Sequence, residues 1–207
     1  MVVRDFFGAE LRREVAAKVG AIEARTRAEV VVCVRPWCSD YAEARGRAGA
    51  LLAFAALGVL LFAPYDFSVR AMPVHVALAY VVGVLLARWS PPLRRALTRS
   101  SERARAVELA ASAHFFDRRL GATSKQTAVL VYVGALERRV GLRFDVGLDP
   151  GFAQGAIRDT EARLADATAR LDGKAFVDAL GALGEALATI APADDDDRNE
   201  LPNEVDA

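Results

Sequence analysis

Two acidic side chains, Asp145 and Asp149, come closest to what a metal site requires. Asp145 is expected on the solvent face of a strand just before Gly147, and Asp149 follows that glycine by two residues. Carboxylates beside a glycine loop are typical ligands of a divalent cation, calcium or magnesium. The sequence therefore offers Asp145 and Asp149 as metal ligands. The alternative is an ordinary surface ion pair between Asp145 and Arg143, which lie two residues apart on one strand face.

A metal at this place would suit phosphate-ester hydrolysis, which needs a nucleophile or a metal-held water together with cationic groups. The other groups of the right chemistry are the carboxylates of Glu29 and Asp40 and the guanidiniums of Arg138, Arg139 and Arg143. No Gly-rich phosphate loop and no Ser/His/Asp arrangement accompanies them. The sequence therefore assigns no catalytic residue.

The cysteines and histidines have simpler explanations. Cys33 and Cys38 are separated by four residues and have no second pair of ligands nearby in the sequence, which disfavours zinc. Cys33 is expected to fill a core position in a strand. His114 stands beside two aromatic residues and is expected to be partly buried and structural. His75, near the start of an apolar segment, is expected at a membrane interface.

Composition excludes several classes of protein. The 207 residues carry 27 basic and 27 acidic side chains, and this balance disfavours a nucleic-acid binder. An apolar share of 53% excludes a chain that is disordered throughout. Two cysteines are too few for a disulfide scaffold.

Charged residues disappear from two neighbouring segments, which predicts a membrane hairpin with spans of about 48–65 and 71–88. A helix of either length is roughly 27 Å long, just short of a hydrocarbon core of about 30 Å, and Tyr65 and Trp89 are suited to the interfaces. The linking residues, between Pro64 and Pro73, predict a tight turn. The alternative, a pair of buried core helices, is disfavoured because both segments are apolar on every face.

The arginines predict the orientation of this hairpin. Nine of them flank it closely, and only Arg70 stands in the turn: the nine are Arg35, Arg45, Arg47, Arg88, Arg94, Arg95, Arg99, Arg103 and Arg105. Both termini are therefore expected in the cytoplasm, with the hairpin in a bacterial inner membrane. The segment from Arg88 to Arg105 is expected to attract anionic lipid headgroups. Residues 1–27 have no apolar stretch of the kind that a signal peptide needs.

Hydrophobic periodicity predicts the remaining elements. Helices are expected at 5–25, 39–47, 93–120, 152–171 and 174–190, and strands at 29–34, 128–133 and 140–148, the last two forming an antiparallel hairpin. The early strand cannot be stable alone, so it should join the later two in one sheet. We therefore expect one α/β (α+β-like) domain with a small central mixed sheet flanked by helices. Residues 1–47 and 89–191 form it, the hairpin at 48–88 interrupts it, and an acidic disordered tail follows at 192–207.

The order of these segments resembles the TPM domain family, in particular a bacterial membrane-inserted subgroup with a central two-helix hairpin. The matching segments are Thr26–Val32, Ser39–Tyr41, Thr123–Val133, Leu136–Leu148 and the tail Asn199–Pro202. The resemblance covers nearly all the chain. The chain departs from the family pattern at Lys125–Ala128, where an Arg-Thr-Gly type of sequence is usual. It also departs in the helix after Gly151, which lacks the expected Trp.

The resemblance implies a small α/β domain, in agreement with the periodicity. The family includes thylakoid-lumen proteins linked to acid phosphatase activity and to photosystem repair, and some soluble members are similar to metal-binding domains. We expect a membrane-anchored, cytoplasm-facing interaction or assembly module, with the bilayer and a protein partner or a second copy as partners. The alternative is a metal-dependent phosphatase working near the membrane surface.

Overall fold

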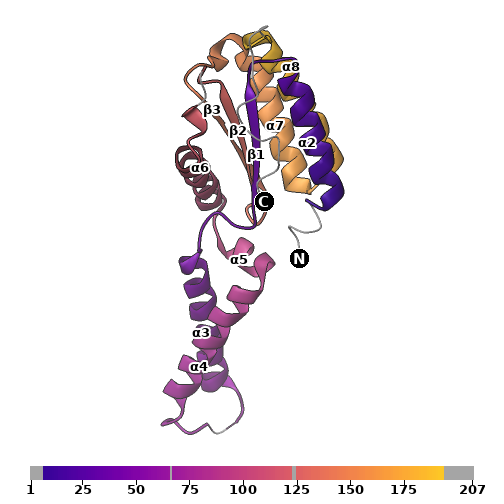
Figure 1. The fold of residues 1–207 in the computed structure, drawn as a ribbon. Helices are drawn as coiled ribbons and strands as arrows, with labels where there is room; N and C mark the ends of the chain where they lie inside the picture. The colour runs from indigo at the N-terminus through magenta and orange to yellow at the C-terminus, as the bar shows by residue number, and fades with distance from the viewer. Residues whose placement is uncertain (1–6, 66, 123–124, 194–207) are drawn as a thin grey trace. The chain divides into compact units, whose positions relative to one another are not determined.

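A computed structural model describes residues 7–65, 67–122 and 125–193, apart from the side chains of residues 150 and 152. The chain divides into two compact units (Figure 1). The first consists of Met1–Cys38 and Ala104–Ala207, and the second of Ser39–Arg103. The second unit is therefore an insertion in the sequence of the first.

The first unit is built from α2 (Ala9–Glu23), β1 (Glu29–Arg35), η1 (Leu120–Ala122), β2 (Ala128–Gly134), β3 (Arg139–Phe144), η2 (Pro150–Ala153), α7 (Gln154–Arg170) and α8 (Gly173–Ile190). The second contains α3 (Ala42–Phe62), α4 (Met72–Trp89) and α5 (Pro91–Leu97). Helix α6 (Ser100–Asp117) begins in the second unit and ends in the first.

The three strands form one mixed sheet in the order β1-β2-β3. Strand β1 runs parallel to β2, with Glu29 opposite Ala128, and β2 runs antiparallel to β3, with Val131 opposite Leu142. The prediction that the early strand joins the later two is therefore confirmed. The chain has the expected mixed α/β fold around a small sheet.

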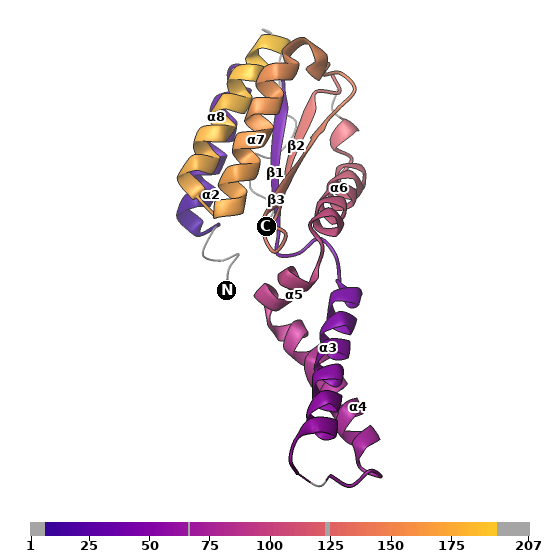
Figure 2. The ribbon, with the colours of Figure 1, turned by 180° about the vertical axis from the view of Figure 1, so that it is seen from behind.

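Helices cover both faces of this sheet. Helices α2, α7 and α8 lie on one face, and α6 lies on the other (Figures 1 and 2). Between its charged first and last residues, Glu29 and Arg35, strand β1 contains only β-branched and other apolar residues, as expected of a strand that is covered on both faces. Val32 faces the α2 and α8 side, whereas Cys33 packs with Val107 of α6 on the other.

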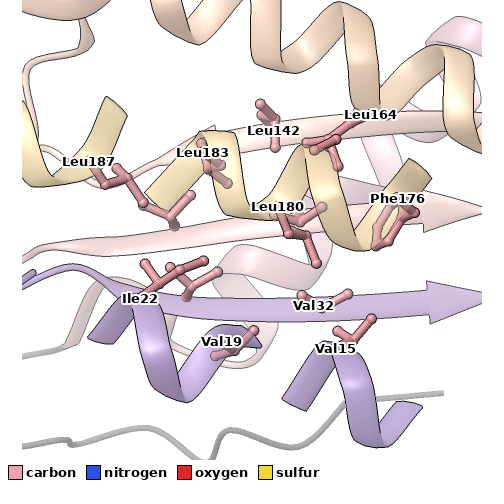
Figure 3. Packing of buried hydrophobic residues seen from close by; sticks show 14 of the residues in the cluster. Val15, Val19, Ile22, Val32, Leu142, Leu164, Phe176, Leu180, Leu183 and Leu187 are labelled. Carbon is pink, nitrogen blue, oxygen red and sulfur yellow. The ribbon is translucent and has the colours of Figure 1, made fainter. Parts of the chain in front are cut away.

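The larger core fills the space between the sheet and its three-helix layer. Figure 3 shows side chains from α2, α8 and the strands pointing toward one another there. The fully buried members include Val15, Phe176, Leu180, Leu183 and Leu187, all at or below 1% exposure. In α8 the leucines recur every three or four residues, so one stripe of the helix is apolar and packs inward. Asp172 begins this helix by accepting a hydrogen bond from the Ala175 amide at 3.0 Å.

The predicted long helix at 93–120 is wrong, because the chain forms two helices, α5 and α6, separated at Thr98. Thr98 has an extended backbone, with φ −101° and ψ 127°. The guanidinium of Arg103 donates hydrogen bonds of 2.8 Å to the carbonyls of Arg95 and Thr98. These bonds satisfy carbonyls at the end of α5 that a continuous helix would have paired with its own amides.

The predicted strand at 140–148 also ends early, at Phe144. The Asp145 carboxylate accepts a hydrogen bond from the Val146 amide at 2.8 Å, so this amide makes a local bond. Val146 is consequently 83% exposed, although the alternation of apolar and polar residues at 140–148 predicts that its side chain is covered. Leu148 still reaches the core.

The predicted start of the tail at residue 192 is wrong. Pro192 forms a bridge with Thr26, and the Ala193 amide donates to the Arg25 carbonyl at 3.2 Å. Residues 192 and 193 therefore belong to the folded unit. The acidic residues from 194 onward, and with them the tail motif at 199–202, lie outside the described residues.

Candidate functional site

Helices α3 and α4 are both long enough and apolar enough to cross a membrane. They pack against each other, yet most of their large apolar side chains face away from the protein. The exposed ones are Leu51, Phe54, Leu57, Val59, Leu61, Phe62, Val74, Leu78, Tyr80, Val81, Val82, Leu85, Leu86 and Trp89. Water-soluble proteins rarely expose a continuous apolar surface of this size.

Small residues allow the two helices to cross closely. A Cβ atom added to Gly83 of α4 would lie 2.6 Å from the Ala48 carbonyl oxygen and 2.8 Å from the Gly49 Cα of α3. A Cβ atom on Gly49 would lie 2.8 Å from the Tyr80 ring. The backbones thus touch where they cross, a packing mode that is common between helices in lipid.

Ion pairs surround the charged N-terminal end of α3. Arg45 holds both carboxylate oxygens of Asp40, at 2.8 and 2.6 Å. Arg47 donates to Glu43 at 3.0 Å and to Glu102 of α6 at 2.9 Å. It also donates to the Leu97 carbonyl of α5 at 2.9 Å. Asp40, a candidate carboxylate from the sequence, therefore serves as a partner of an arginine, which lowers the pKa of its carboxyl.

Asp145, the leading metal candidate, lies directly after β3 and is 93% buried, with an exposed fraction of 7%. One carboxylate oxygen accepts from the Val146 amide, and the other, also buried, has no hydrogen-bond partner among the residues that the structure describes. A Cβ atom added to Gly121 would lie 3.3 Å from this carboxylate. The alternative interpretation, a surface ion pair between Asp145 and Arg143, is wrong, because Arg143 instead pairs with Glu108 of α6 and donates to the Ser112 hydroxyl at 3.0 Å.

The other sequence candidates lie in different places. Asp149 is exposed and caps η2, where its carboxylate accepts from the Gly151 amide at 2.8 Å. Glu29 is buried at the start of β1, and Arg138 donates to the Ala169 carbonyl of α7 at 3.3 Å. Arg139 begins β3 and is half-buried. Within the described residues, no three His, Cys, Asp or Glu side chains are grouped closely enough to hold a metal ion.

Sequence reasoning missed a buried polar cluster on the α6 side of the sheet. Glu137, which is 1% exposed, accepts a hydrogen bond from the Cys38 amide at 2.9 Å. Burial, and then the charge of Glu137, raises the pKa of the Cys38 thiol, while burial raises the pKa of the Tyr132 hydroxyl. Without a Cβ, Gly134 leaves the space that the Cys38 thiol and the Glu137 carboxylate occupy. The sequence gives no signal of this cluster, because Glu137 stands in a charged segment that predicts an exposed turn. Only the structure shows that Glu137 is buried.

Both cysteines are free, and Cys33 is fully buried as expected. His114 is partly buried, with its ring centre 5.7 Å from that of Tyr132. His75 is exposed on α4, and its Nδ1 lies 2.8 Å from the Ala71 carbonyl oxygen. The surroundings of Cys33 and His114 are those that the sequence predicts, and the membrane-interface position of His75 stays a prediction.

No family model matches the chain, and no curated protein does. Among solved structures, the chain is similar to the NMR structure of the BA42 protein from the psychrophilic bacterium Bizionia argentinensis. The two are 16% identical, with a TM-score of 0.58, over 97% of this chain and 94% of the other. This likeness shows that the chain shares its α/β fold with a known bacterial protein.

Proposed function

We propose that this chain is a bacterial inner-membrane protein whose TPM-type domain faces the cytoplasm and acts as an interaction or assembly module. The observation that carries the proposal is the apolar surface of α3 and α4, which the protein leaves exposed. A lipid bilayer is the surrounding that removes such a surface from water. The shared fold with BA42 supports a compact α/β domain attached to it.

Charge supports the proposed orientation. The turn between α3 and α4 contains one arginine, Arg70, whereas the segments flanking the hairpin contain nine. Positive charge is retained on the cytoplasmic side during membrane insertion. Both parts of the α/β domain then lie on the same side of the membrane, as a single sheet requires.

Cysteine labelling in intact cells tests this topology. Ser68, in the turn, and Ser101, on α6, are both exposed and are each replaced by cysteine. Native Cys33 and Cys38 give little background, because one is fully buried and the other has a raised thiol pKa. A membrane-impermeant maleimide should label Ser68→Cys in intact cells and Ser101→Cys only after permeabilisation. The opposite pattern would contradict the proposed orientation. Labelling of both cysteines only after permeabilisation, with the chain in the soluble fraction, would contradict membrane anchoring.

Helix α6 offers the surface for the module function. Leu109 and Phe116 are 62% and 78% exposed, and their spacing of two turns places them on one outward face. We take a second copy of the chain as the partner. The double variant Leu109→Glu/Phe116→Glu should then lower the mass that light scattering reports for the protein in detergent, whereas Asp145→Ala should leave it unchanged. Equal masses for all three proteins would contradict self-association through α6.

One buried oxygen of Asp145 has no partner within the described part of the chain, and this favours the second candidate function, a metal-dependent phosphatase. A buried carboxylate oxygen without a hydrogen bond is costly, and a bound cation would satisfy it. Calorimetric titration of calcium and magnesium into the protein in detergent tests this function. Binding tighter than about 100 μM that Asp145→Ala abolishes, and that the exposed control Asp159→Asn retains, would support it. Absence of binding would remove its main support.

A further inference from the structure

The hairpin base, which we define as residues 39–47 and 88–103, has a strong excess of positive charge. It contains seven arginines, at 45, 47, 88, 94, 95, 99 and 103, and three acidic residues, at 40, 43 and 102. The opposite end, at 63–71, contains one acidic residue and one arginine. The hairpin is therefore electrically asymmetric along its length.

Three arginines gather around Asp40. Arg45 binds both oxygens of this carboxylate. Arg88, at the end of α4, and Arg94, of α5, lie near enough for their charges also to lower the pKa of Asp40. One negative charge thus faces three positive ones, contributed by helices that precede and follow the hairpin turn.

A second group forms around Glu102. Arg47 binds this carboxylate from α3, and the backbone amide of Arg99 donates to it at 3.3 Å. The charge of Arg99 adds to that of Arg47 in lowering the pKa of Glu102. Because Arg47 also bonds the end of α5, the arginines are held on a connected framework. Because these side chains are already ordered, the binding of a ligand costs less conformational entropy.

An exposed aromatic residue lies beside these charges. Trp89 ends α4, follows Arg88 and is 73% exposed. Tryptophan is enriched at the level of lipid headgroups, where its ring contacts chains and its N–H contacts polar groups. A surface with a tryptophan and several guanidiniums fits a ligand that combines an apolar part with an anion.

We propose that the hairpin base binds the phosphate groups of anionic phospholipids. The inference rests on the proposed function, because it requires the hairpin to lie in a bilayer. Guanidiniums suit phosphate, because they donate two parallel hydrogen bonds. The excess of arginine over acidic residues supplies the preference for anionic over zwitterionic lipid. The lipid at this end of the hairpin then anchors it at a defined depth.

Trp89 provides a direct readout. In a Trp37→Phe background it is the remaining tryptophan, and brominated lipids quench its fluorescence on contact. The full chain is reconstituted into phosphatidylcholine vesicles that contain either brominated phosphatidylglycerol or brominated phosphatidylcholine as the minor lipid. The quenching by the two lipids gives the ratio of their association constants, which we call the relative constant. We expect this ratio to favour phosphatidylglycerol by about fivefold for one arginine that contacts a lipid phosphate. Added salt should reduce this preference.

Matched arginine variants locate the site. Arg88→Gln/Arg99→Gln removes two exposed arginines of the hairpin base and should bring the relative constant close to one. The control Arg70→Gln removes an arginine from the turn and should leave the constant unchanged. Equal quenching by the two lipids, or a preference that survives in Arg88→Gln/Arg99→Gln, would overturn the inference.

Alkaline carbonate extraction of the same vesicles distinguishes a failure of the headgroup site from a failure of membrane anchoring. A chain that remains in the vesicles without a lipid preference contradicts the headgroup site alone. A chain that carbonate removes contradicts the membrane anchoring on which the site depends.

Discussion

The carboxylate of Glu137 joins two segments that are 99 residues apart, because it accepts a hydrogen bond from the Cys38 amide. Burial, and then the charge of this carboxylate, raises the pKa of the Cys38 thiol. Tyr132, in the same cluster, also keeps its proton, chiefly because it is buried. The Cys38 thiol and the Tyr132 hydroxyl therefore lose their protons at a higher pH in the folded protein than in the unfolded chain.

These raised pKa values predict that the folded protein loses stability in alkaline solution. The pKa values of Cys38 and Tyr132 are higher in the folded protein than in the unfolded chain, so the folded state binds more protons above about pH 8.5. The free energy of unfolding should therefore stay constant from this source below about pH 8.5 and fall as the pH rises. Urea unfolding of the protein in detergent at pH 7.5, 9 and 10 measures the change. The double variant Cys38→Ala/Tyr132→Phe should show a smaller fall, and an identical fall would contradict this assignment.

Removal of the Glu137 side chain should destabilise the α/β unit. Glu137→Ala leaves the Cys38 amide without its acceptor, which costs about 1–3 kcal/mol in a buried setting. Glu137→Gln keeps an acceptor oxygen and removes the negative charge, so it should also speed alkylation of Cys38 by iodoacetamide. Urea unfolding and alkylation rates measure the two effects, with the exposed Glu161→Gln as the control. A rate that Glu137→Gln leaves unchanged would show that burial alone protects the thiol.

At the scale of elements, the crossing of α3 and α4 depends on the absence of side chains. Gly83 meets the backbone of Ala48 and Gly49 directly, so no rotamer of a larger residue relieves the contact. Gly58, by contrast, has no neighbouring atom within 4 Å of an added Cβ. The two glycines therefore predict opposite outcomes for the same substitution.

Gly83→Leu should separate the two helices, whereas Gly58→Leu should leave them packed. The first change places a Cβ 2.6 Å from the Ala48 carbonyl oxygen, well inside the contact distance. Gel mobility in SDS and the thermal midpoint in detergent report whether the hairpin stays closed. Similar mobility and midpoint for the two variants would contradict direct backbone packing.

The sequence predicted most elements because their signals are local. The β-branched run of β1 and the leucine spacing of α8 each suffice to identify an element. The break between α5 and α6 escaped prediction, because the bonds that fix it come from the Arg103 guanidinium, a side-chain choice that periodicity does not contain. Asp145 was placed on a solvent face for a similar reason, since its own carboxylate ends the regular strand.

At the scale of the whole molecule, the expected common sheet of the early and late strands is confirmed by β1 and β2. Asp145 and Asp149 remain predicted ligands, and the structure gives them different surroundings, one buried and one exposed. The positions of the two carboxylates relative to each other depend on how the chain turns after β3, and no local sequence pattern specifies this turn. Glu137 was missed because burial of a charged side chain follows from tertiary packing.

The insertion should be separable from the α/β unit. The larger core lies wholly within the first unit and draws on α2, β1, β2, β3, α7 and α8. A chain in which a flexible Gly/Ser linker replaces residues 42–97 should therefore fold and stay in solution without detergent. Circular dichroism and an NMR spectrum with dispersed amide signals would demonstrate this. An aggregated or unfolded product would show that the unit requires its hairpin.

The parallel pairing of β1 with β2 also affects the timing of synthesis. Glu29 leaves the ribosome about 100 residues before its partner Ala128, which at about 5–20 residues per second is a delay of about 5–20 s. The two apolar helices emerge during this interval. Strand β1 therefore stays without its β2 partner until both helices have been synthesised, so the sheet is completed only after the whole inserted segment has been made.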